Sequence, residues 1–101
     1  MTATAGTRIR LDKWLWHARI TKTRSLAAKL VETGQVRVNH RKIEKPAHDV
    51  RPGDIITVAV HDAIRVLRVI APGARRGPAS EARELYEEIE APQPSHAAPQ
   101  N

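Results

Sequence analysis

Apolar residues in the first third of the chain recur at helical spacing in two segments. The first segment follows Arg10 and places four apolar residues on one side of a helix, namely Leu11, Trp14, Leu15 and Ala18. The second covers residues 21–34 and repeats this spacing at Leu26, Ala27, Leu30 and Val31. Because only a few residues join the segments, the pattern predicts two short helices whose apolar stripes face each other.

The second of these helices carries clear signals at both ends. Thr21 or Thr23 can cap its start with a side-chain oxygen, and Gly34 stands where a left-handed residue ends a helix. Lys22 and Arg24 lie at the same start, where the helix dipole makes each cation unfavourable by roughly 0.3–1 kcal/mol. Free backbone N–H groups, hydroxyls and two cations together suit a phosphate, so we predict a phosphate-binding helix start. A solvated basic turn is the alternative.

Alternation of apolar and polar residues replaces the helical spacing after this helix. Residues 35–39 predict a strand that buries Val36 and Val38 and turns its polar side chains outwards. Residues 39–42 predict a turn, and Ile43 begins a short return.

The most hydrophobic part of the chain predicts a second pair of strands. Residues 55–60 and 64–70 are β-branched runs with a short joint, which indicates an antiparallel hairpin beneath the helices. Residues 71–78, rich in Pro and Gly, predict a loop. Ser80 is then expected to cap an acidic helix that ends at about Ile89.

These elements predict an α+β fold, in which a small helix-helix-strand motif packs on a short, mostly antiparallel sheet and is followed by a C-terminal helix. The expected parts are a flexible arm at residues 1–7, the main domain at 8–70, a loop and acidic C-terminal helix at 71–90, and a disordered tail at 91–101.

Charge is distributed unevenly along the chain, whose formal net charge is +6. Residues 8–54 carry twelve Lys and Arg against five Asp and Glu, whereas residues 80–101 carry one Arg against five Glu. A basic first half indicates a polyanionic partner, either nucleic acid or an acidic membrane surface. With two Trp, one Tyr and no Phe, the chain lacks the aromatic rows that stack single strands, which favours the phosphates of folded or double-helical RNA.

Several kinds of chemistry find no support in the sequence. There is no cysteine, and the five histidines show no ligand-like spacing, so we predict no metal site, no cofactor and no catalytic residues. We therefore expect neither an enzyme nor a small-molecule substrate. No segment approaches the ~20 apolar residues of a membrane span, and residues 1–7 lack the pattern of a signal peptide, which predicts a cytoplasmic protein without a membrane partner.

Four motifs in combination closely resemble the RNA-binding domain named after ribosomal protein S4. They are residues 10–15, 22–27, 34–39 and 52–54, and the resemblance covers roughly residues 8–60. Further along, residues 14–16, 75–78 and 84–88 look like the bacterial fifteen-kilodalton heat-shock family, whose members associate with ribosomes.

The resemblance implies a function and a set of RNA-binding residues. The function is binding to ribosomal RNA, and possibly tRNA, in a large ribosomal subunit that carries a stalled peptidyl-tRNA, with recycling of that subunit under heat stress. A monomer is expected. The alternatives are an accessory domain for a separate RNA-modifying enzyme and a basic protein-interaction module. The implied RNA surface comprises Arg8, Arg10, Lys13, Arg19, Lys22, Thr23, Arg24, Ser25, Lys29, Arg37, Asn39 and Lys42.

Overall fold

A computed structural model of the chain describes residues 8–94. Two short strands and two helices begin the fold: β1 (Ile9–Arg10), α1 (Leu11–His17), α2 (Arg24–Glu32) and β2 (Val36–Val38), in an order interrupted only by turns. The rest of the described chain consists of β3 (Arg41–Lys42), β4 (Asp49–Val50), β5 (Ile55–Val60), β6 (Ala63–Val69), α3 (Ala79–Ala82), a 3₁₀ turn (Arg83–Leu85) and β7 (Tyr86–Pro94). The combination confirms the predicted α+β class.

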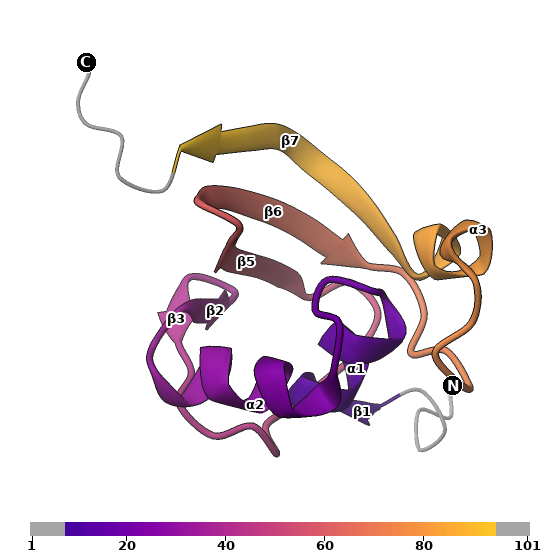
Figure 1. Cartoon of the computed structure of the whole chain (residues 1–101), viewed down its shortest axis with the longest axis horizontal. Helices are drawn as coiled ribbons and strands as arrows, with labels where there is room; N and C mark the ends of the chain where they lie inside the picture. The colour runs from indigo at the N-terminus through magenta and orange to yellow at the C-terminus, as the bar shows by residue number, and fades with distance from the viewer. Residues whose placement is uncertain (1–7, 95–101) are drawn as a thin grey trace.

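Five strands form one antiparallel sheet in the order β3-β2-β5-β6-β7, and β1 pairs with β4 in a separate two-stranded ribbon. Figure 1 shows α1 and α2 on one side of the molecule and β7 along the opposite side. The edge of the sheet far from the helices is therefore formed by β7, from the C-terminal part of the chain.

Two tight turns set the register of the sheet. His61 and Asp62 both have positive φ, of 52° and 62°, and join β5 to β6 in the mirror-image geometry that suits twisted hairpins. Asn39 and His40, with φ of 52° and 74°, do the same between β2 and β3. The hairpin and the asparagine turn are as predicted, but the return strand starts at Arg41 rather than at Ile43, because the turn needs only two residues.

The core lies between the two helices and the inner face of the sheet. Trp14 is fully buried, and its indole N–H donates a 3.0 Å hydrogen bond to the Ala71 carbonyl. The alternation predicted for β2 holds, since Val36 and Val38 are buried and the residue between them is exposed. The other fully buried apolar residues of the core are Leu11, Leu15, Ala27, Val31, Val50, Ile56, Val58 and Leu67.

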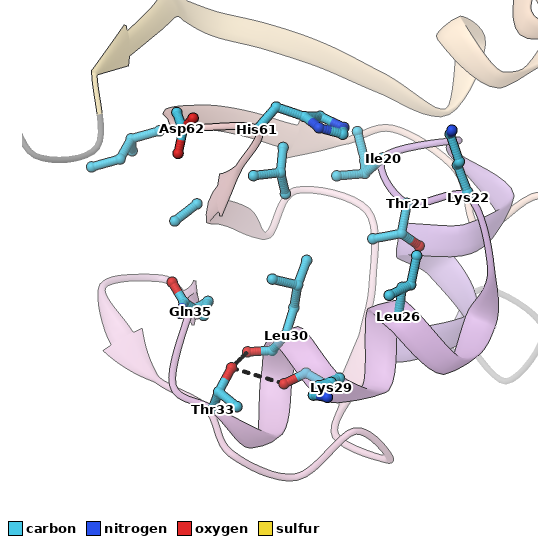
Figure 2. Close-up of a pocket in the computed structure, with 13 residues that line it drawn as sticks. Ile20, Thr21, Lys22, Leu26, Lys29, Leu30, Thr33, Gln35, His61 and Asp62 are labelled. Carbon is cyan, nitrogen blue, oxygen red and sulfur yellow. Dashed lines mark hydrogen bonds between the residues drawn. The ribbon is translucent and has the colours of Figure 1, made fainter.

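One prediction for the second helix is wrong. Ala27 and Val31 face the core, but Leu30 is only half-buried and Leu26 is 49% exposed. The apolar stripe is therefore narrower than its sequence spacing suggested, because the β5–β6 hairpin does not reach over the first turn of α2 (Figure 2).

The C-terminal helix exists but is much shorter than predicted. It starts after Pro78 without a side-chain cap, so Ser80 is not its capping residue, and Tyr86 already begins β7 rather than continuing the helix to Ile89. The predicted tail also starts too early, because residues 91–94 belong to β7, while the remainder of the tail and the arm at 1–7 lie outside the described residues.

Contacts between β6 and β7 explain why residues 86–94 form a strand rather than a helix. Arg65 donates two hydrogen bonds to the Glu88 carboxylate, the shorter at 2.7 Å, and Arg68 forms a 2.7 Å ion pair with Glu87. These hydrogen bonds are the main cause that raises the pKa of Arg65 above its usual value. Tyr86 packs edge-on against the Trp14 ring. Such distant contacts outweigh the helix propensity of the glutamates.

Candidate nucleic-acid interface

The start of α2 is capped by a hydroxyl of the preceding turn. Thr23 has an extended backbone, and its Oγ accepts a 3.1 Å hydrogen bond from the Leu26 N–H. Thr21 is buried and donates its own hydroxyl to the Thr23 carbonyl at 2.9 Å. The predicted cap is therefore Thr23, and Lys22 lies exposed in the turn that these two threonines fix.

A buried carboxylate holds two of the predicted RNA-binding arginines together. Asp12 accepts hydrogen bonds from Arg10 Nε and Nη2, both at 3.1 Å, and its Oδ2 lies 3.6 Å from Arg24 Nε. The Asp12 side chain is 4% exposed, whereas those of Arg10 and Arg24 are 47% and 43% exposed. The anion beside Arg24 is thus supplied by the protein itself, and two guanidinium groups share one negative charge at the surface.

Several other predicted cations have no acidic partner among the residues that the structure describes. Across residues 8–94, ion pairs involve none of the predicted cations Lys13, Lys22, Lys29 and Arg37. We refer below to the α1–α2 basic surface, which consists of the exposed residues Arg10, Lys13, Lys22, Arg24, Ser25 and Lys29. It combines an arginine pair of fixed geometry with free lysines and a capped helix start, which is the arrangement that favours a phosphate backbone.

Two further predicted residues form a second group on the β2–β3 hairpin. Arg37 and Lys42 are directly opposite each other in the antiparallel pairing and both are exposed. Arg37 projects from the face of β2 that is turned away from the core, since its neighbours Val36 and Val38 are buried.

Several predicted residues have partners that point to structural roles. The Asn39 amide donates to Asp54 at 3.1 Å and its oxygen accepts from the Ile55 N–H at 2.9 Å, so this side chain fixes the turn onto β5. Arg19 Nε donates a 2.6 Å hydrogen bond to the Gly77 carbonyl. Arg8 lies 3.7 Å from Asp49 and Lys42 lies 3.8 Å from Glu44, both in exposed pairs of little strength.

Two residues that are not part of the basic surface but hold it in place, Asp12 and Arg76, could not be identified from the sequence. The role of Asp12 depends on α1 and α2 packing side by side, which no local pattern encodes. Arg76 belongs to a predicted loop, but its Nη2 lies 3.4 Å from the Thr21 carbonyl, next to Lys22 in the chain, and its buried Nε has no partner among the described residues. The Arg75-Arg76 doublet was the available signal.

We also searched the described residues for a metal site and for a membrane-spanning helix. Between residues 8 and 94, no group of three or more His, Cys, Asp and Glu side chains is arranged to hold a metal ion. Every helix in the same range is too short or too polar to cross a lipid bilayer.

Comparison with known families agrees with this geometry. The family model of the S4 domain matches residues 9–56, which contain α1, α2 and β2 to β4 together with the whole α1–α2 basic surface. The fold and the matched residues thus define a domain of the S4 class, the RNA-binding class that the sequence motifs resemble.

The wider comparisons extend beyond that domain. Heat shock protein 15 homolog of Aeromonas salmonicida is 44% identical over 89 residues, which are 88% of this chain and 67% of that protein. Heat shock protein 15 of Escherichia coli is 44% identical over 80 residues, 79% of this chain and 59% of that protein. A trimeric structure of Vibrio cholerae heat shock protein 15 superimposes with a TM-score of 0.74 at 42% identity, covering 81% of this chain and 82% of the other.

The chain therefore belongs to the heat shock protein 15 family. It spans about three fifths of the length of the E. coli relative, 59% by the matched residues.

Proposed function

We propose that this protein binds folded ribosomal RNA through the α1–α2 basic surface, with Arg37 and Lys42 as a second contact on the β2–β3 hairpin. Its target is the large ribosomal subunit that carries a stalled peptidyl-tRNA, so that tRNA is a possible second ligand. The setting is ribosome recycling in the cytoplasm under heat stress, in keeping with the heat shock relatives.

The observation that carries this proposal is the arginine pair on Asp12. Two guanidinium groups are held by one buried carboxylate, which leaves the pair with an excess positive charge and most of its remaining N–H donors free. Lys22 and the capped start of α2 stand beside Arg24 in the chain. Phosphate contacts of this kind position a protein on RNA without reading its sequence, which suits a folded RNA surface.

Salt dependence of RNA binding tests the surface. Each neutralised phosphate releases counterions, so we expect a log–log slope that corresponds to about four to eight phosphate contacts. Lys22→Ala should weaken binding and lower the slope by about one contact. Arg68→Ala is the control, because Arg68 is already paired with Glu87 on the other side of the sheet. A slope near zero, or an equal loss with Arg68→Ala, contradicts the proposed surface.

Co-sedimentation with ribosomal subunits tests the target. We expect the protein to pellet with large subunits that carry peptidyl-tRNA and to remain in the supernatant with small subunits. Equal binding to all subunits would leave RNA binding in place and reject the specific target. Incubation of the pure protein with ribosomal RNA, followed by analysis of modified or cleaved products, tests whether the chain has an enzymatic activity of its own.

We also propose that the free protein is a monomer. The sequence favours a monomer, whereas the V. cholerae relative is described as trimeric. Sedimentation velocity of the free protein across a concentration series distinguishes the two, and a single concentration-independent species of monomer mass is the expected result.

A further inference from the structure

A groove of about 900 Å³ lies between α2 and the turn of the β5–β6 hairpin. Aliphatic side chains line it from both sides, with Leu26 and Leu30 on the helix and Val60 and Ile64 on the hairpin. Figure 2 shows Leu30 directed from the helix towards the hairpin and Leu26 directed towards Thr21, in the turn before the helix. The volume lies in the range of sites that hold a small organic group, such as one nucleotide.

Leu26 is the unusual residue in this groove. It is 49% exposed, although it stands on the most basic helix of the chain. Lys29 follows it by three residues on the same helix, Lys22 lies in the turn before the helix, and both line the groove. An apolar side chain between two uncompensated cations is unfavourable for a purely phosphate-binding surface. It matches a ligand that combines an apolar face with a negative charge.

Polar groups lie at the ends of the groove. Gln35 stands at one end, and His61 and Asp62 of the hairpin turn stand along the rim, where Figure 2 shows the His61 ring directed towards Ile20. At the edge of a base, the Gln35 amide can donate or accept a hydrogen bond and the Asp62 carboxylate can accept one. Because Asp62 repels phosphate, the negative group of a ligand is expected at the other end of the groove, beside Lys22 in the turn before α2.

We propose that this groove takes one unpaired nucleotide of the bound RNA, with its base against Leu26, Leu30 and Val60 and its phosphate beside Lys22. The inference rests on the proposed function and adds a ligand subsite to it. Flipped-out bases are held between apolar side chains as well as aromatic ones, so the scarcity of aromatic residues does not oppose it. RNA is favoured over an acidic peptide because the two lysines belong to the α1–α2 basic surface.

The test compares RNA hairpins with identical stems, one fully paired and four with a single bulged A, C, G or U. Fluorescence anisotropy with the full chain should show that at least one bulged hairpin binds about three- to tenfold more tightly than the paired one. Leu26→Ala should abolish this preference without changing the affinity for the paired hairpin, and Leu26→Met should retain it. Ile70→Ala is the matched control, because Ile70 is 46% exposed and lies outside the groove.

Methyl NMR spectra give a second readout that does not depend on affinity. The Leu26 and Val60 methyl signals should shift with a bulged hairpin and stay in place with the paired hairpin. Equal affinity for all five hairpins, or an equal loss for all of them in Leu26→Ala, overturns the groove inference while RNA binding stands. If no hairpin binds in a salt-dependent manner, the proposed function fails and the inference fails with it.

Discussion

Replacing Asp12 with asparagine removes the carboxylate that Arg10 and Arg24 share and keeps the size of the side chain. Breaking a buried ion pair costs about 3–5 kcal/mol, but both arginines are nearly half exposed and can regain water, so we expect the low end for a charged hydrogen bond, about 1.5–2 kcal/mol. For a domain of this size, this loss lowers the melting temperature by roughly 6–15 °C.

The effect of Asp12→Asn on RNA binding separates two roles for the carboxylate. The substitution raises the net charge by one, which by itself strengthens RNA binding. It also frees two long side chains, and each of them then costs about 0.5–1.5 kcal/mol to order on the RNA. We expect the second effect to win, so that the Kd for ribosomal RNA rises roughly five- to thirtyfold in anisotropy titrations below the melting temperature of the variant.

Glu87→Gln is the matched control for the charge. It makes the same change in net charge, but it releases only Arg68, whose pair lies on β7. We expect it to leave the Kd for RNA unchanged or slightly lower. If Asp12→Asn loses stability yet binds RNA as tightly as the unaltered protein, Asp12 serves stability alone and the positioning argument is refuted.

Two further substitutions test the turns that support the surface. Thr23→Ala removes the oxygen that caps Leu26 N–H and should lower the free energy of unfolding by about 1 kcal/mol in denaturant titrations, whereas Thr23→Ser should restore it. Asn39→Ala loses the bonds to Asp54 and Ile55 and strains a residue with a φ of 52°, for an expected loss of about 1–3 kcal/mol. Asn39→Gly should recover the backbone part of that loss, and an unchanged RNA affinity of this variant would establish Asn39 as structural.

The features that sequence predicted well are those encoded within a few residues. Thr23 caps α2 because its own hydroxyl reaches a backbone N–H three residues on, and Gly34 ends the helix with a φ of 79°. Asn39 takes the left-handed turn for which its residue type is suited. In these cases the signal and the structure that it produces lie in the same short segment.

The features that sequence missed depend on contacts between distant segments. The glutamates at 87 and 88 have a good propensity for helix, yet they extend into β7 because Arg65 and Arg68 stand opposite them on β6. The function of Asp12 arises only when α1 packs beside α2. Leu26 has the correct helical phase for burial but lies beyond the reach of the hairpin, which its own neighbours in the chain could not reveal.

The pairing of β7 with β6 also changes where the positive charge of the protein can act. Arg65 and Arg68 lie in a strand that sequence alone would count as basic, but Glu88 and Glu87 neutralise them at 2.7 Å. Five cations that form no ion pair among the described residues lie on or next to α1, α2 and the β2–β3 hairpin, namely Lys13, Lys22, Lys29, Arg37 and Arg41. We therefore expect a polyanion to be drawn to the side of the molecule that carries these cations. If RNA binds at the proposed surface, we expect the acidic strand to contribute to orientation on the RNA without touching it.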